Sequence, residues 1–202
     1  FEHGADPVPE LMWMVLVGKN PRWQGLPEDH FALAHRLYAA GVAIDLPFAV
    51  ALGQMEEAKS FVDENGLLLP SANTEYRPRM PDSPSDQEIL NISLSYAAYG
   101  GQEKAVDWLL HLGADINARP RGFFRGRSSP RGGSTAIHKA VYADNGHMIR
   151  HLAKRGADLQ LPDEGWGARP SEWAKHLDRS EAIQALDDLL QDGQTTAEEK
   201  NE

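Results

Sequence analysis

A recurring short pattern constrains this chain more than any other feature of its sequence. It is clearest in residues 134–159, where an apolar helix face, a turn at 144–146, a second apolar helix face and a Gly-Ala-Asp ending follow one another. Related parts recur at spacings of a few tens of residues, which indicates an array of similar units. Two short helices packed back to back cannot bury their outer faces alone, so each unit requires neighbours.

This segment resembles an ankyrin repeat. Residues 135–138 stand where that family has Thr-Pro-Leu-His, residues 146–147 stand where it has Gly-His, and residues 156–158 match its Gly-Ala-Asp. The resemblance implies an all-α ankyrin repeat solenoid of about five helix-pair repeats with long inter-repeat loops. Between Ala140 and Gly146 the segment has two residues more than the family pattern, so we expect the first helix or its turn to be extended there.

Glycines predict where the other units lie. Gly18, Gly53, Gly101 and Gly146 are expected at one register point, between the two helices of a unit. The predicted domain is a single ankyrin repeat domain over residues 1–193. Its first repeat is truncated at the N-terminus, with helices at 9–18 and 28–40, and its last repeat is a C-terminal cap. Residues 194–202 are polar and acidic and are expected to form a disordered tail.

Composition excludes several classes of protein. The chain has 30 acidic residues against 20 lysines and arginines, for a formal net charge of −10, which argues against general binding to nucleic acids or anionic membranes. It has no cysteine, which excludes disulfides and thiol catalysis. No stretch approaches the roughly 18 consecutive apolar residues of a membrane span. We therefore expect a cytoplasmic monomer with no membrane partner.

A largely aromatic row recurs on the first helix of each unit. It occupies the position after the motif histidine and the position three residues later. In ankyrin arrays the first helices line the concave side, so the resemblance implies a binding groove. The alternative is that the row packs between adjacent repeats as half-buried core. The candidate groove residues are Trp13, Phe48, Tyr96, Tyr99, Lys139, Tyr142 and Trp173.

A basic segment at residues 119–131 is the second candidate site. It has five arginines, no acidic residue and two central phenylalanines, although the chain as a whole is acidic. Arginine and aromatic side chains together can bind carboxylates, phosphates or a stacked base. Alternatively, the phenylalanines fold back on the array and the arginines pair with its acids. The candidate residues of this finger are Arg121, Phe123, Phe124, Arg125 and Arg127.

Histidines give only a weak metal signal. His147 and His151 have the i, i+4 spacing of metal ligands, but no third ligand lies at a telling distance. The resemblance instead makes His138 and His147 structural residues that bond to backbone groups, so no metal or cofactor is expected. No nucleophile elbow, phosphate loop or dinucleotide fingerprint is present. A catalytic set could still be assembled across the groove from His35, His111, His138 and Asp144.

Two functions remain open on the sequence. The first is a non-catalytic scaffold that recognises another protein through the groove and the finger; nucleic acid is an unlikely partner. The alternative is a small-molecule or enzymatic pocket in the groove, walled by the long inserts at 20–29, 70–85 and 118–133. A deep pocket with a buried histidine or carboxylate would favour the alternative. A shallow, open groove would favour the protein-binding scaffold.

Overall fold

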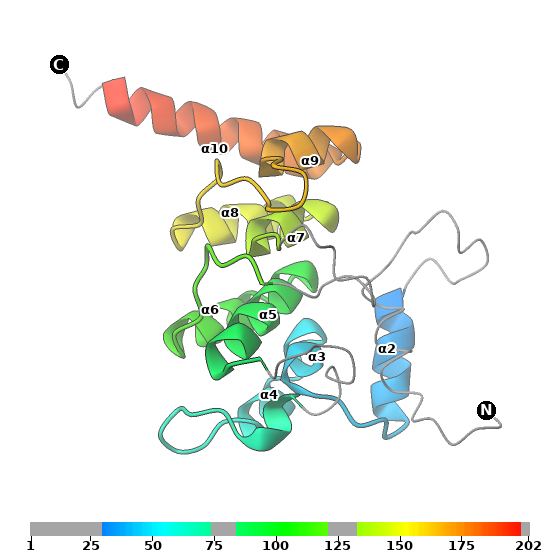
Figure 1. Cartoon of the computed structure of the whole chain (residues 1–202). Coiled ribbons are helices and arrows are strands. Elements are labelled where there is room, and N and C mark those ends of the chain that lie inside the picture. The colour runs from blue at the N-terminus through cyan, green and yellow to red at the C-terminus, as the bar shows by residue number, and fades with distance from the viewer. Residues whose placement is uncertain (1–29, 74–83, 121–132, 199–202) are drawn as a thin grey trace.

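The computed structural model describes residues 30–73, 84–120 and 133–198, and these residues are helical (Figure 1). The candidates Gly18 and Trp13 and the five named finger residues lie outside these ranges. Within them the one non-helical pairing is an isolated bridge between Val62 and Leu68. The elements are α2 (His30–Ala39), α3 (Leu46–Ala51), α4 (Met55–Ser60), a 3-10 turn η1 (Pro70–Asn73), α5 (Asp86–Tyr99), α6 (Glu103–His111), α7 (Ala136–Tyr142), α8 (Gly146–Lys154), α9 (Pro170–His176) and α10 (Ser180–Glu198).

The helices from α3 onward form stacked antiparallel pairs. In the described part of the chain these pairs are α3/α4, α5/α6, α7/α8 and α9/α10, and the first helices contact one another in the order α3, α5, α7, α9. The all-α prediction is confirmed for this part. Of the five predicted pairs, the first cannot be assessed because residues 9–18 lie outside the described ranges. The predicted tail boundary at 193 is wrong, because α10 continues to Glu198.

Helix α2 does not sit where the sequence placed it. Residues 28–40 were expected to be the second helix of the first pair, but Figure 1 shows α2 standing upright beside the stack. The ring of Phe31 lies 5.5 Å from that of Tyr99 at the end of α5. Ala34 is fully buried and Tyr38 is half-buried. Spacing of i, i+3 and i+7 places these three residues on one helix face, so α2 packs by a stripe across the helix ends.

Left-handed residues set the turn between the helices of each pair. Gly53 and Gly101 have φ values of +70° and +71°, and Asp144 and Asp178 occupy the same place with φ of +54°. The register position in the third pair is therefore Asp144, and the prediction of Gly146 was wrong by two residues. The predicted local extension is also absent, because residues 143–145 form a turn as long as 100–102. Aspartate tolerates this conformation better than most residues.

Gly146 is needed for packing instead. A Cβ atom there would lie 2.8 Å from the carbonyl oxygen of Glu181, so α8 and α10 are in close contact at this point. The Asp144 carboxylate also accepts a hydrogen bond from the Ala182 N–H at 3.0 Å, which satisfies one free donor in the first turn of α10.

Small residues let the first helices approach closely. A Cβ on Gly100 would lie 2.1 Å from the Ala51 carbonyl oxygen, which shows that the backbones of successive pairs nearly touch. Such contact is possible only where side chains are small, since protein interiors are packed as densely as organic crystals. Fully buried alanines therefore recur along α3, α5, α7 and α9: Ala49, Ala97, Ala98, Ala140 and Ala174.

His138 ties α7 to the following loop, as the resemblance predicted. Its Nδ1 lies 2.8 Å from the Thr135 hydroxyl, and its Nε2 lies 3.0 Å from the Ala168 carbonyl oxygen. Because a carbonyl only accepts, Nε2 carries the hydrogen and Nδ1 accepts from Thr135. The ring is fully buried against Trp173. Burial lowers the pKa of His138 from 6.5 to about 4, although the bond to Ala168 opposes this shift.

We expect the substitution Ala140→Asp to unfold the array cooperatively. It would place an unpaired carboxylate in a fully buried contact, at a cost of about 3–5 kcal/mol against a typical total stability of about 5–15 kcal/mol. Circular dichroism during thermal unfolding measures this directly. The substitution Ala39→Asp on the exposed side of α2 is the control. Equal melting temperatures for the two variants would mean that the packed face of α7 is misassigned.

His138 predicts a loss of stability in acid. The folded pKa of about 4 lies below the ordinary value of 6.5, so the unfolded chain takes up the proton first. The stability that neutral His138 provides is full above about pH 6.5 and is lost as pH falls through 4, by up to roughly 3 kcal/mol. Urea unfolding between pH 7 and 4 should show a smaller acid loss in His138→Gln than in wild type. Equal losses in the two proteins would contradict the assignment.

Candidate functional site

Most of the predicted groove residues are in the core. Phe48, Tyr96, Tyr99 and Trp173 are all buried, and the rings of Phe48 and Tyr96 meet edge to face at 5.5 Å between α3 and α5. For these side chains the structure agrees with the packing interpretation and not with an open groove. The reason is the close approach of the first helices, which leaves the row between them inaccessible to a partner.

Tyr142 and Lys139, both on α7, differ from each other. Tyr142 is half-buried, with its ring 5.9 Å from that of Tyr99 and with the Arg179 guanidinium 5.7 Å from its centre. Lys139 is 2% exposed. Burial lowers the pKa of Lys139 from 10.5 to about 7, partly opposed by the negative charge of Asp163. Lys139 is therefore a core residue and not a groove cation.

The loop between α8 and α9 is organised by one buried carboxylate. Asp163 accepts hydrogen bonds from the N–H groups of Gly165, Trp166 and Ala168 at 2.6, 2.7 and 3.0 Å, and from the indole N–H of Trp173 at 3.0 Å. Burial alone would raise the pKa of Asp163, but the bonds that it accepts outweigh burial and lower the pKa. This ionised carboxylate fixes the backbone of the loop in one conformation.

The same loop carries Trp166 at the surface. Its side chain is 75% exposed, which makes it the most exposed large apolar side chain in the described part of the chain. Its ring meets that of Trp173 edge to face at 5.5 Å, so one edge is held while the rest faces solvent. Sequence reasoning missed this residue. The available signal was a tryptophan between two glycines at 165–167, directly after an aspartate that can organise a turn.

Both ends of the predicted finger attach to this loop. The Arg119 guanidinium donates to the Pro162 carbonyl at 3.1 Å and lies 3.5 Å from a Glu164 carboxylate oxygen. The Gly133 N–H donates to the Glu164 carboxylate at 3.2 Å, and the Glu164 N–H donates to the Gly133 carbonyl at 3.0 Å. The chain therefore leaves for residues 121–132, and returns from them, beside the loop that presents Trp166.

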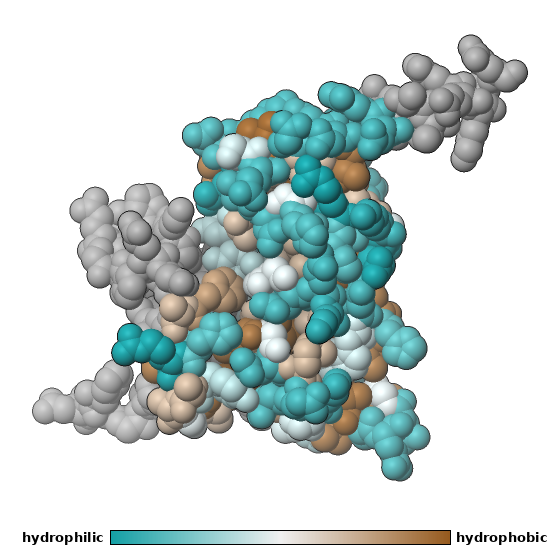
Figure 2. Space-filling view, turned by 180° about the vertical axis from the view of Figure 1, so that it is seen from behind, coloured by the Kyte–Doolittle hydropathy of each residue, from teal (hydrophilic) through white to brown (hydrophobic). Residues whose placement is uncertain are grey.

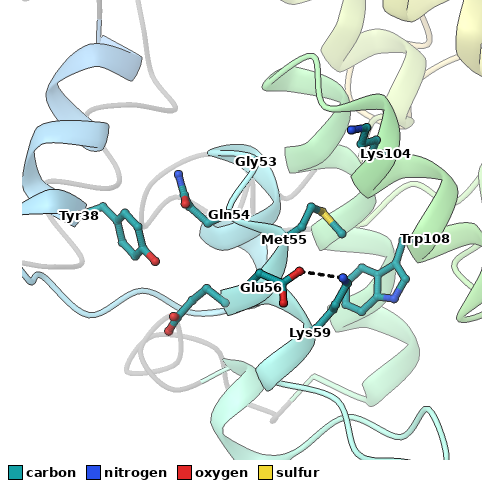
Figure 3. Close-up of a pocket in the computed structure, with 9 residues that line it drawn as sticks. Tyr38, Gly53, Gln54, Met55, Glu56, Lys59, Lys104 and Trp108 are labelled. Atoms are coloured by element: carbon teal, nitrogen blue, oxygen red, sulfur yellow. Dashed lines mark hydrogen bonds and ion pairs between the residues drawn. The ribbon is translucent and has the colours of Figure 1, made fainter.

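A hollow of about 850 Å³ lies at the other end of the stack (Figure 3). Its side chains come from α2, α4 and α6 and from the turn at 53–54, and it is open to solvent. The Glu56 carboxylate there pairs with the Lys59 ammonium at 2.9 Å, and both side chains are well exposed. None of its lining residues is a histidine or a buried carboxylate, so it lacks the features that would favour an enzymatic pocket. The lining residues are Tyr38, Gly53, Gln54, Met55, Glu56, Glu57, Lys59, Lys104 and Trp108.

The remaining catalytic and metal candidates have separate structural roles. His138 is bonded in the core and Asp144 bonds to the first turn of α10, whereas His35 and His111 are exposed on α2 and α6. The predicted backbone bond of His147 is wrong, because its Nδ1 lies 2.9 Å from a Glu103 carboxylate oxygen. No group of three or more histidines, cysteines and acids within the described ranges could hold a metal ion.

The surface gives no sign of a broad apolar interface on the face that Figure 2 shows. The upper half of that view, which holds the C-terminal pairs, is mainly hydrophilic, and the apolar residues gather in the lower half. In the part of the chain that the structure describes, no helix combines the length and apolar character needed to cross a membrane. Recognition at the C-terminal end would therefore depend on individual residues such as Trp166.

Comparison with known proteins bears on the family. Residues 94–153 match the family model described as ankyrin repeats in many copies, and the match runs from α5 into α8. Similar curated proteins include the inactive serine/threonine-protein kinase TEX14 of Mus musculus, 32% identical over 95 residues (47% of this chain and 6% of that protein). The Bos taurus TEX14 is 37% identical over 82 residues (41% and 5%). This chain thus spans only a small part of the relatives that it matches. Together with the stacked helix pairs, the family match identifies residues 94–153 as members of the ankyrin repeat family.

Proposed function

We propose that this protein is a non-catalytic scaffold that binds another protein through a surface at the loop end of the third and fourth helix pairs. We call this the finger surface and define it by Trp166, Arg119 and the loop 160–168. Ankyrin repeats generally mediate protein–protein interaction, which supports the class of function. The position of the surface rests on the geometry of the Asp163 loop.

One observation carries the proposal: a buried carboxylate holds an exposed tryptophan in place. Asp163 accepts three backbone hydrogen bonds and one indole hydrogen bond, while Trp166 stays 75% exposed. An exposed tryptophan is unfavourable in water, and tryptophan is enriched among residues that dominate binding energy. A loop that is already ordered loses little entropy on association. Trp166 therefore has the exposure and the rigidity of an interface anchor.

Charge suggests the character of the partner. The arginines at 121, 125 and 127 belong to the segment whose two ends attach beside Trp166. On a chain of net charge −10 this segment is a local concentration of positive charge. Complementary charge accelerates association and selects partners. The proposed partner therefore presents an acidic face with an apolar recess for the indole, and the two phenylalanines at 123 and 124 could contribute further apolar contact.

The substitution Trp166→Ala should weaken partner binding by tenfold or more with little change in folding stability. Truncating a dominant interface residue typically costs about 2 kcal/mol or more, whereas Trp166 contributes little to the core. The matched control is Leu67→Ala, since Leu67 is 63% exposed on a distant loop after α4. Isothermal titration calorimetry with a purified partner, first isolated on the wild-type chain, measures both effects. Loss of affinity in Leu67→Ala but not in Trp166→Ala would refute the proposed surface.

A further inference from the structure

A cluster of charged side chains joins the second helices of two neighbouring pairs. Glu103 and Asp107 lie one turn apart on α6, and His147, His151 and Arg155 follow at four-residue intervals on α8. Such spacing places each set on one helix face, so the two rows oppose each other where α6 and α8 are neighbours in the stack (Figure 1). The finger surface does not include these residues, and no role has been assigned to them above.

His151 lies between two carboxylates. Its Nδ1 is 3.3 Å from a Glu103 oxygen and its Nε2 is 2.8 Å from an Asp107 oxygen, and its side chain is only 12% exposed. A neutral imidazole carries one N–H, whereas the imidazolium carries two. Carboxylates only accept hydrogen bonds when they are ionised. Both contacts are therefore satisfied only when His151 is protonated, and loss of a proton turns a nitrogen lone pair toward a negative oxygen.

The surrounding charges leave this requirement in place. Arg155 donates to both oxygens of Asp107 at 2.9 and 2.8 Å. Partial burial would raise the pKa of Asp107, but the hydrogen bonds from Arg155 and His151 outweigh it and lower the pKa. His147 also contacts Glu103, at 2.9 Å, but its side chain is 84% exposed.

The other helices packed on α8 direct their charges elsewhere. On α10, Asp188 pairs with Arg150 at 2.9 Å. On α7, His138 bonds to Thr135 and to the Ala168 carbonyl, and the charge near Lys139 is that of Asp163. The groups that decide the protonation state of His151 are thus Glu103 and Asp107, with Arg155 and His147 beside them.

We propose that His151 is a pH-sensitive latch between the α5/α6 and α7/α8 pairs. The latch is closed when the imidazolium donates to Glu103 and Asp107, and it weakens when His151 loses a proton. Histidine ordinarily titrates near pH 6.5, within the physiological range. The folded state holds this proton more firmly than the unfolded chain, so the contribution of the latch is full below about pH 6.5 and decreases as pH rises. The junction that loosens is the one spanned by the segment that leads from α6 to α7.

Urea unfolding of the full chain at a series of pH values from 5.5 to 8.5 tests the latch. The informative quantity is the difference in urea midpoint between wild type and His151→Gln at each pH. This difference should be largest at pH 5.5 and should fall by at least half by pH 8.5. Other titrations, including that of His138 with its opposite sign, occur in both proteins and cancel in the difference.

Three further variants make the test specific. His147→Gln is the matched control, because His147 touches the same Glu103 but is exposed, and it should keep the wild-type pH profile. Glu103→Gln and Asp107→Asn retain His151 but remove one anionic acceptor each, and both should reduce the pH dependence. These two variants also carry the test if His151→Gln does not fold. A midpoint difference that stays constant with pH, or an equal loss of pH dependence in His147→Gln, would overturn the proposal.

Discussion

Close contact between the first helices of successive pairs is the constraint on which the rest of the structure depends. Alanines and Gly100 allow the backbones of α3 and α5 to approach until a single added Cβ would collide with the Ala51 carbonyl. The large side chains beside these small ones must then fill the remaining space between helices. The aromatic row is consequently part of the core. The same constraint turns Lys139, which shares that row, into a buried residue.

Binding groups have to lie on the loops and on the second helices, because the first helices are occupied with packing. Asp163 shows how a loop can be made rigid without secondary structure, since one carboxylate satisfies four N–H donors. Its bonds end at Trp173, so the loop and the core share one network, and Trp166 stands on that network. Rigid loops on a packed scaffold are common places for recognition. The α6–α8 cluster adds polar contacts on the other row of helices, at the same junction from which the finger arises.

Local patterns in the sequence predicted the helix pairs and the bonds of His138, because both depend on residues within one unit. Features that depend on several units were missed. Asp144 and not Gly146 occupies the left-handed turn, since an aspartate can adopt that conformation and bond to α10 at once. The position of α2 depends on Tyr99, which is distant in the sequence. Burial of Tyr96 and exposure of Trp166 follow from helix spacing and from the Asp163 bonds, neither of which is encoded in residue type.

Chemical labelling of Lys139 tests most directly whether the aromatic row is core and not groove. In the folded chain at pH 7.5, an N-hydroxysuccinimide ester should acylate the exposed Lys59, Lys104, Lys154 and Lys175 and leave Lys139 unmodified, as mass spectrometry of peptides would show. Burial places the pKa of Lys139 at about 7, so an accessible Lys139 would be largely neutral and would react fastest of all. Protection of Lys139 until urea unfolds the chain is the predicted result. Labelling of Lys139 in the folded state, as fast as the exposed lysines, would contradict the account and restore the open groove.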